Sequence, residues 1–370
     1  MKKTIAIILA LVLCLSMFAA CGKTEAPAAP AEPTAPAEPT APTEPAAPAE
    51  PEAPAEPEVP ETRTVIDSKG REIELPYTIE KVAPGVGSMS QITAMLGAAD
   101  KIVAARSDIR NNAFFAKVFS DFNCEYDNSN VEDVFASGAQ VMYSPTYDET
   151  VVAQYNAGGV AYVQLGINSI EEFMTTITII GDVLGEEAPE RASAFIDYFY
   201  GMIDEIQAKT NSVEQKTRVL ALSIKEGSFS IGTSSNMQNS YLSAVGGELF
   251  TEEWEQSAVN VEEIIAFDPE VIFCSAADLE AIMTSEDLQT VSAIVNNRVH
   301  IIPYGTFGWG VNNAEAAGMA PIFYAKYLYP DLFADVDLTA RTQAFYKQFY
   351  NYDLSVEEAE MILNDTLRTK

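Results

Sequence analysis

The sequence predicts an α/β protein with two similar lobes joined by one long helix. Three observations indicate this fold class: short apolar strands alternate with helices, one helix-then-strand phrase occurs twice, and a single long helical segment separates the two copies. Strand–helix alternation with short links favours parallel sheets connected by right-handed crossovers. Because ligands bind beyond the carboxyl ends of strands in open α/β sheets, we expect a ligand cleft between the lobes.

The repeated phrase reads NVEDVFASGAQVMYS at residues 130–144 and NVEEIIAFDPEVIFCS at residues 260–275. Each copy starts with an asparagine, a residue that caps helices well, and closes with an apolar run typical of a buried strand. Glu132 and Glu262 occupy matching places in the expected first turn of each helix, where a negative charge favours the helix dipole. The repeat therefore predicts the same substructure in each lobe.

The remaining segments set the boundaries of the lobes. Strand patterns at KVAPGV, KIVAAR, QVMYS and AYVQLG, with helices between them, assign residues 62–186 to the N-terminal lobe. Apolar residues at helical spacing over Pro189–Lys209 predict one amphipathic linking helix at residues 187–210. The strand patterns RVLALSI, EVIFCS and VHIIPYG assign residues 211–370 to the C-terminal lobe. That lobe is expected to close with helices near Ala314–Leu328, Ala340–Tyr350 and Val356–Leu363.

The beginning of the chain carries a targeting signal and a spacer. Residues 1–20 contain a positive start and an apolar run shorter than the roughly 20 residues that span a bilayer. The run ends in FAAC, which resembles a bacterial lipoprotein signal in which Cys21 becomes lipidated, as with palmitate; an ordinary secretory signal is the alternative. In residues 21–61 proline recurs every third residue, which favours an extended polyproline II spacer with a reach of roughly 110 Å.

Composition limits the classes of function. The chain has 54 acidic and 22 basic residues, so it should repel nucleic acid and anionic membrane surfaces. The chain has one histidine, His300, which is too few for a multi-histidine metal site. Its strand pattern suggests a packed or surface-exposed ring rather than a catalytic one. Cys124 and Cys274 are expected to be free, buried thiols. We expect a monomer that is not an enzyme, with no resident metal and no covalent cofactor.

Several short segments between about Thr64 and Leu363 are similar, in order and spacing, to those of one family. They read TVIDSKGREIELP, LGAADKIVAA, NVEEIIAFDPEVIFCS, NRVHIIPYG, LYPDLF and FYKQFYNYDLSVEEAEMIL. Together they resemble the substrate-binding lipoproteins of ABC importers for ferric siderophores, cobalamin and haem. The resemblance implies the class III periplasmic-binding fold, two lobes bridged by one long helix. In relatives that bind cobalamin, a glutamate of each lobe docks on permease arginines, and Glu132 and Glu262 match those positions.

The strand ends and the resemblance together give a set of candidate ligand-binding residues. The turn after the first strand leads into a helix whose N-terminus can hold an anion. Trp309 matches the family's aromatic position in a glycine-flanked loop, where its ring would stack on a corrin, porphyrin or catechol face. Basic residues beside strand ends suit an anionic ferric siderophore, with surface salt bridges as the alternative. The expected set is Gly85, Ser88, Arg106, Arg110, Tyr143, Tyr147, Lys225, Phe229, Trp309 and Asn313.

The resemblance implies a lipid-anchored protein on the extracytoplasmic face of the cell membrane. It would capture a metal chelate, foremost a ferric siderophore, and deliver it to an ABC importer permease. Cobalamin or haem is the alternative ligand, because the stretch after Trp309 reads GVNNAEAAG and lacks the basic residue of many relatives. A chelate-processing enzyme or an adhesive or sensory lipoprotein on the same scaffold is the alternative of another class.

Overall fold

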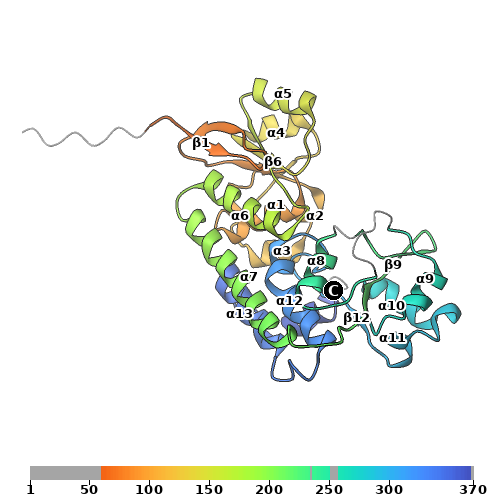
Figure 1. Cartoon of the computed structure of the whole chain (residues 1–370). Helices are drawn as coiled ribbons and strands as arrows, with labels where there is room; N and C mark the ends of the chain where they lie inside the picture. The colour runs from red at the N-terminus through yellow and green to blue at the C-terminus, as the bar shows by residue number, and fades with distance from the viewer. Residues whose placement is uncertain (1–59, 234–235, 251–256, 368–370) are drawn as a thin grey trace, which may run out of the picture. The chain divides into compact units, whose positions relative to one another are not determined.

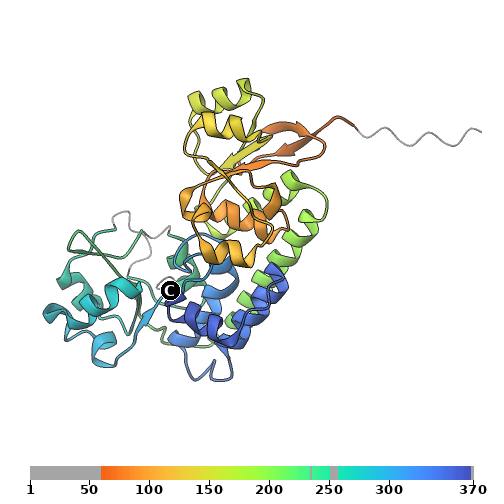
Figure 2. The same ribbon diagram turned by 180° about the vertical axis from the view of Figure 1, so that it is seen from behind.

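The computed structural model describes residues 60–233, 236–250 and 257–367, which Figures 1 and 2 show from two opposite sides. The predicted signal segment, Cys21 and nearly all of the proline-rich spacer lie outside these residues. Across the three described stretches, no helix is both long and apolar enough to cross a bilayer. The mixed α/β architecture with parallel sheets confirms the predicted fold class.

A three-stranded parallel sheet forms the centre of the N-terminal lobe. Its order is β3 (Val82–Pro84), β6 (Val141–Ser144) and β7 (Ala161–Gln164). α1 (Gly87–Met95) follows β3, and α5 (Glu149–Ala157) connects β6 to β7, as the alternation predicts. Every residue of β6 is buried, which explains its uninterrupted apolar character.

An antiparallel hairpin that the sequence analysis did not assign lies beside the edge strand β7. It pairs β1 (Thr62–Ile66) with β2 (Glu72–Pro76) around a turn in which Gly70 has a φ of +76°. The Ser68 N–H donates a hydrogen bond to the Gln164 carbonyl of β7, which ties the hairpin to the sheet. The smaller elements of this lobe are η1 (Ala99–Lys101), β4 (Ala104–Ala105), α2 (Ser107–Arg110), α3 (Ala113–Val118) and β5 (Tyr126–Asp127).

The C-terminal lobe repeats the arrangement of the N-terminal sheet. Its parallel strands are β8 (Val219–Ala221), β11 (Val271–Cys274) and β12 (Val299–Ile301), with β11 in the middle. The expectation of one strand over RVLALSI is wrong. Only β8 joins the parallel sheet, and β9 (Ser223–Lys225) forms an antiparallel hairpin with β10 (Ser228–Ser230). The helices and turns of this lobe include α8 (Met237–Ala244), α10 (Ala276–Thr284), η2 (Glu286–Leu288) and α11 (Ser292–Val295).

The repeated phrase has the same structure in both lobes, as predicted. It forms α4 (Val131–Ser137) followed by β6, and α9 (Val261–Phe267) followed by β11. Asn130 and Asn260 cap the two helices, each accepting a hydrogen bond of 2.8 Å from a backbone N–H three residues later. In both lobes the phrase therefore supplies the central strand of the sheet.

The linking helix α7 (Ala188–Thr210) packs against α6 (Ile170–Leu184) and α12 (Ala314–Leu328), and Figure 1 shows it in green beside both. Gly185, with a φ of +70°, ends α6. The last helices are α13 (Leu338–Tyr350) and α14 (Val356–Leu363). One continuous hydrophobic cluster includes side chains of α1, α7, α12 and α13, so the two lobes share a core.

Candidate functional site

A pocket of about 470 Å³ lies at the carboxyl ends of the C-terminal sheet. Leu222, Ser275 and Ile302, the residues that directly follow β8, β11 and β12, all line it. Parallel strands place their carboxyl ends at one edge of a sheet, which is where open α/β sheets bind ligands. The volume lies within the range of sites for small molecules.

Polar and charged side chains surround the mouth of this pocket. Lys225 of β9 and Asp365, which follows α14, are its two charged lining residues among those that the structure describes. Asn236 caps α8 by accepting a hydrogen bond of 2.8 Å from the Gln238 N–H, and both side chains line the pocket. The amide of Gln238 donates to the Tyr324 hydroxyl at 3.0 Å. These groups can orient a ligand that carries both charge and hydrogen-bonding atoms.

Two aromatic side chains on the loop after β12 form one wall of the pocket. The rings of Tyr304 and Phe307 are nearly parallel, with 16° between their planes and 6.5 Å between their centroids. Phe307 also reaches the N-terminal lobe, since a Cβ placed on Gly87 of α1 would lie 2.8 Å from its ring. Residues 302–313 therefore contribute the pocket's aromatic surface and bring it against α1.

The prediction that Trp309 presents its ring to a ligand is wrong in this structure. Trp309 has no exposed surface; its ring packs edge-on against Phe323, with 5.8 Å between the centroids. The indole N–H donates a hydrogen bond of 2.9 Å to Glu315. The flanking glycines give the backbone freedom, but the buried acceptor and the neighbouring ring draw this indole inward.

The other predicted residues of the C-terminal lobe divide into one in the pocket and two outside it. Lys225 lines the pocket, so its contact with a ligand stays a prediction. Phe229 instead packs against the second hydrophobic cluster of this lobe, because its strand β10 folds back onto β9. Asn313 is fully buried and caps α12 by accepting a hydrogen bond of 2.8 Å from the Ala316 N–H. For Phe229 and Asn313, the expected contact with a ligand is replaced by a structural role.

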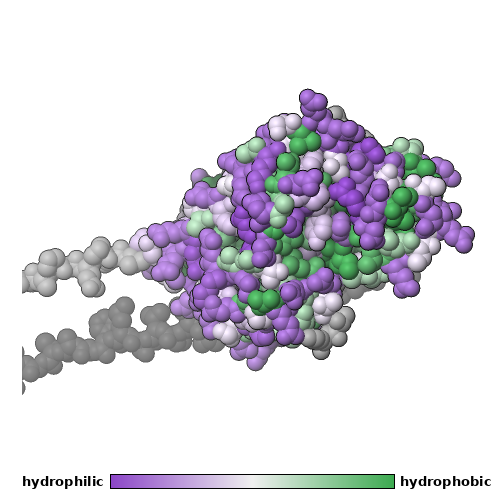
Figure 3. Space-filling model, turned by 90° about the horizontal axis from the view of Figure 1, so that it is seen from below, coloured by the Kyte–Doolittle hydropathy of each residue, from purple (hydrophilic) through white to green (hydrophobic). Residues whose placement is uncertain are grey.

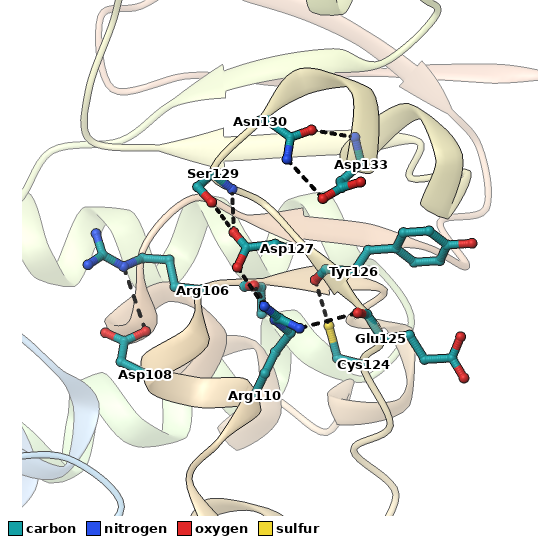
Figure 4. A network of polar contacts seen from close by, with 11 residues as sticks. Arg106, Asp108, Arg110, Cys124, Glu125, Tyr126, Asp127, Ser129, Asn130 and Asp133 are labelled. Atoms are coloured by element: carbon teal, nitrogen blue, oxygen red, sulfur yellow. Dashed lines mark hydrogen bonds and ion pairs between the residues drawn. The ribbon is translucent and has the colours of Figure 1, made fainter.

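None of the predicted residues of the N-terminal lobe lines this pocket. Arg110 is held by its own lobe and donates to the carbonyl of Ala105. Figure 4 shows that it also donates to the carbonyl of Glu125 and forms an ion pair of 2.5 Å with Asp127. Arg106 pairs more loosely with Asp108, at 3.6 Å, and its side chain is half exposed. The salt-bridge alternative therefore describes both arginines in this structure.

The remaining N-terminal candidates have structural surroundings as well. Tyr143 is fully buried and shares a hydrogen bond with Thr93, so it cannot form a ligand wall here. Gly85 allows the chain to pass Ser144, whose Cβ would lie only 2.6 Å from a Cβ at that glycine. Ser88 is buried in the first turn of α1. The predicted ligand contacts of Tyr143, Gly85 and Ser88 are therefore not formed in this pocket, because all three residues pack inside the N-terminal lobe.

Tyr147 belongs to a separate hollow of about 500 Å³ on the N-terminal lobe. The guanidinium of Arg71 lies over its ring, 4.3 Å from the centroid, and Tyr162 lines the same hollow. Arg71 is also paired with Asp67 at 2.5 Å. This hollow is exposed between the β1–β2 hairpin and α5, away from the carboxyl ends of the C-terminal strands.

The sequence analysis did not single out Phe307 or Tyr304, although the quoted segment NRVHIIPYG contains Tyr304. A loop has no periodicity that distinguishes inward from outward side chains. The sequence analysis therefore chose Trp309, the largest aromatic side chain of the loop, as the ligand contact. The useful signal lay six residues downstream of Trp309, where Glu315 is the one acidic residue within the apolar AEAAGMAPIF segment. A carboxylate there requires buried donors, and the indole N–H is one of them.

The titratable residues outside the pocket have packing roles. His300 is half-buried in β12 with its ring 4.0 Å from that of Tyr327, and burial together with Arg298 lowers its pKa to about 4. Both body cysteines are free, as predicted; Cys274 is buried, whereas Cys124 is only partly so. Burial raises the pKa of Cys124 to about 11 and that of Cys274 to about 12, so both stay protonated and unreactive.

The two repeated helices expose matching surfaces. Glu132 and Glu262 are both exposed in the first turn of α4 and α9. Three residues later each helix exposes an apolar side chain, Phe135 at 38% and Ile265 at 41%. The capping role of the neighbouring asparagines does not involve either glutamate, which leaves both carboxylates available to a partner.

Comparison with known proteins identifies the family and the fold. Residues 118–304, half of the chain, match the family described as "Periplasmic binding protein". The molybdate-binding protein MolA of Haemophilus influenzae is 26% identical over 104 residues, which span 27% of this chain and 30% of that protein. Its molybdate-bound structure has a TM-score of 0.66 at 16% identity, covering 79% of this chain and 99% of that chain.

Two further solved structures share the fold. A periplasmic solute binding protein from Veillonella parvula has a TM-score of 0.71 at 22% identity, covering 84% of this chain and 99% of that chain. Helicobacter pylori CeuE with bound Ni(II) has a TM-score of 0.64 at 20% identity, covering 81% of this chain and 99% of that chain. The similarity extends over nearly the whole described body and is a similarity of fold.

Proposed function

The chain belongs to the periplasmic binding protein family, and we propose that it is the extracytoplasmic substrate-binding protein of an ABC importer for a metal chelate. The observation that carries this proposal is the pocket at the carboxyl ends of β8, β11 and β12, where a two-lobed α/β protein is expected to hold its ligand. The shared core of the two lobes supports capture with little rearrangement, because tightly packed cores resist continuous deformation.

The lining of the pocket favours a compact anionic chelate with a flat face. Tyr304 and Phe307 offer stacked rings to such a face. Lys225 offers a positive charge to an anionic group, with Asp365 as the other charged residue of the lining. A ferric siderophore of the catecholate kind combines both properties and is the ligand that we propose. Cobalamin and haem are larger flat ligands, and the single histidine lies in β12, so a haem would need tyrosine or methionine as its iron ligand.

Proteins similar to this chain bind ligands of different chemical classes. MolA is described as binding molybdate and CeuE as binding Ni(II), so members of this fold hold both small oxyanions and metal ions. Molybdate could use Lys225 and the Asn236 and Gln238 amides but would leave the aromatic wall without a partner. The aromatic wall is therefore the feature that favours a chelate over a bare oxyanion.

We also propose that Glu132 and Glu262 dock the protein on its permease. They are exposed at equivalent positions of two separate lobes, each beside an exposed apolar residue. Figure 3, which views the molecule from below, shows a mostly hydrophilic face with apolar residues gathered near its centre. Two separated ion pairs would set orientation rather than affinity, since exposed pairs contribute about 0–1 kcal/mol each.

Attachment to the membrane through Cys21 completes the proposal. The FAAC junction and the proline-rich spacer motivate it, and both lie outside the described residues. Changing Cys21→Ser should abolish incorporation of labelled palmitate and release the protein from the membrane fraction. Continued lipid labelling of the Cys21→Ser protein would show that the anchor lies elsewhere or is absent.

The ligand class can be tested with a visible absorption spectrum of the purified protein, followed by titration. The probes are ferric tris-catecholate, ferric tris-hydroxamate, cyanocobalamin, haemin and molybdate. The proposal expects a broad ferric charge-transfer band or tight binding of a ferric probe. A corrin spectrum or a Soret band would replace the siderophore with cobalamin or haem. Conversion of a chelate into products would favour the enzyme alternative, whereas binding of none of the probes would favour an adhesive or sensory lipoprotein.

A further inference from the structure

Glu315 is a fully buried carboxylate in the first turn of α12, close behind the aromatic wall of the pocket. Two residues of the loop 302–313 donate hydrogen bonds to it. The Thr306 backbone N–H and hydroxyl donate to Oε2 at 2.9 and 2.6 Å, and the Trp309 indole N–H donates to Oε1 at 2.9 Å. The loop is thus tied to this single side chain on both sides of Phe307.

Two further elements meet at the same carboxylate. The Tyr346 hydroxyl of α13 donates to Oε1 at 2.8 Å, and the Gln91 amide of α1 lies 3.4 Å from Oε2. Gln91 also donates to the Thr306 hydroxyl at 2.7 Å and accepts from the Ala314 N–H at 2.9 Å. A side chain of the N-terminal lobe therefore caps a helix of the C-terminal part and shares the carboxylate's network.

Space around Glu315 is restricted to fit this arrangement. A Cβ on Gly305 would lie 1.9 Å from Oε1, so the loop can pass the carboxylate only with glycine at that position. Burial raises the pKa of Glu315, while the hydrogen bonds from Thr306, Trp309 and Tyr346 act in the opposite direction. A buried carboxylate is tolerated when donors surround it, and hydrogen bonds to a charged acceptor are stronger than neutral ones.

We propose that Glu315 is the positioning residue of the ligand pocket, holding the loop 302–313 so that Phe307 faces the pocket and stays against the N-terminal lobe. Because Thr306 and Trp309 are both drawn inward to one carboxylate, the residues between them are turned outward. The loop between β12 and α12 contains no regular strand or helix. Its backbone supplies an isolated bridge between Tyr304 and Gly308 and a hydrogen bond of 3.0 Å from the Trp309 N–H to the Pro303 carbonyl, and Glu315 adds the side-chain contacts that join the loop to α12. This inference rests on the proposed function, since it takes the pocket as the ligand site.

The first test compares ligand affinity with stability. Glu315→Gln keeps the shape but replaces one acceptor oxygen with an amide that faces donors. Arg191→Met is the matched control, because Arg191 also joins elements, donating to the carbonyls of Met95 and Phe349, but does not touch the loop. We expect Glu315→Gln to weaken binding of ferric tris-catecholate tenfold or more, and Arg191→Met to change it less than twofold. Equal affinity losses at equal melting temperatures would overturn the inference.

The second test does not depend on the ligand. Trp254 and Trp309 are the two tryptophans of the chain. In a Trp254→Phe protein, all tryptophan fluorescence therefore comes from Trp309. In that background, Glu315→Gln should change the emission maximum and increase quenching by acrylamide at least twofold, as should Gly305→Ala, which displaces the carboxylate without removing its charge. Arg191→Met should leave both readouts unchanged.

The two tests separate failure of the inference from failure of the proposed function. If the wild-type protein binds no ferric probe, the proposed ligand is wrong, but the Trp309 emission still reports whether Glu315 holds the loop. Unchanged emission and quenching in both Glu315→Gln and Gly305→Ala, with folded protein in each case, would overturn the positioning role whatever the ligand.

Discussion

The two lobes share one topology but differ in the loop that follows the last strand of each sheet. The N-terminal lobe passes from β7 to α6 through residues 165–169, whereas the C-terminal lobe passes from β12 to α12 through residues 302–313. The short loop is held by Thr176, whose buried hydroxyl bonds both backbone groups of Gly166. The long loop is held by a buried carboxylate and builds the aromatic wall. The comparison shows that two similar lobes differ most at this loop, and that the longer loop supplies the aromatic side chains that line the pocket of the C-terminal lobe.

The two copies of the repeated phrase, by contrast, have stayed alike. Both present a capped helix, an exposed glutamate and an exposed apolar residue before a buried central strand. A ligand needs a pocket in one place only, whereas docking on a two-sided partner uses a contact on each lobe. The different loops and the matching helices therefore fit the two halves of the proposed function.

The largest effect is expected from Trp309→Ala, which tests whether the long loop depends on its anchor. Removing a fully buried tryptophan should lower the free energy of unfolding by about 3–5 kcal/mol, and it also leaves Glu315 without one donor. Urea unfolding measures this. Val311→Ala is the control in the same loop; its exposed side chain should change stability by about 0.5 kcal/mol or less. Unchanged stability with lost ligand affinity would instead support the original sequence prediction for this residue.

Phe307→Ala sharpens the contrast between the aromatic wall and the aromatic hollow of the other lobe. Losing the ring should weaken binding of the ferric probe by about 1–3 kcal/mol while the fold survives, because Phe307 lines the pocket. Isothermal titration measures the affinity. Tyr147→Ala, in the N-terminal hollow, is the matched control and should bind normally. Normal binding by Phe307→Ala together with weakened binding by Tyr147→Ala would contradict the assignment of the site to the C-terminal lobe.

Titration of an edge strand should affect stability in the C-terminal lobe only, because β12 contains the protein's one histidine and β7 contains none. Free histidine is protonated below a pKa of about 6.5, whereas His300 in the folded protein stays neutral until its pKa of about 4. The unfolded chain therefore binds more protons between these values, and stability must fall as pH decreases from about 6.5.

Allowing for the partial exposure of the ring, we expect His300 to contribute a loss of about 1–2 kcal/mol between pH 7 and pH 5. Urea unfolding at the two pH values measures it in the wild-type protein and in His300→Gln. The substituted protein should lose correspondingly less stability on acidification. An identical pH dependence in both proteins would mean that the ring is protonated as readily in the fold as in water.

The smallest energetic effect is expected from the matching helices. Glu132→Ala with Glu262→Ala should leave ligand affinity intact and reduce uptake more than either single change, at about 0–1 kcal/mol per ion pair. The double change to lysine should be worse, because like charges would then face the permease. Glu171→Ala with Glu357→Ala, at the second position of α6 and α14, is the matched control. Normal uptake by the Glu132 and Glu262 double variant at matched protein levels would make these glutamates simple helix-start acids.

Much of the fold could be predicted because local pattern and tertiary packing agree. α12 and α14 begin and end where the sequence indicated, and the repeated phrase gives both central strands. The break between β8 and β9 was missed because the apolar run at residues 219–222 continues past the end of β8 without a polar residue. Its signal was the turn at Glu226 and Gly227, both with positive φ, which is the two-residue geometry that closes a hairpin.

The ligand site was less predictable because side-chain direction in a loop depends on distant partners. Nothing near Trp309 in the sequence indicates that Gln91 and Tyr346 converge on the same carboxylate. Arg110 likewise looked like a ligand contact, but the carbonyl of Glu125 and the carboxylate of Asp127 satisfy it. Lys225 lines the pocket as the last residue of the short strand β9, where its position at a strand end decides its surroundings.

The most direct test of the central claim is the position of iron in crystals of the protein soaked with ferric tris-catecholate. Anomalous diffraction at the iron absorption edge locates the metal independently of the chelate's shape. The account predicts one iron peak in the pocket at the carboxyl ends of β8, β11 and β12, beside Phe307 and Lys225. An iron peak in the N-terminal hollow beside Arg71 and Tyr147, with the C-terminal pocket empty, would contradict it.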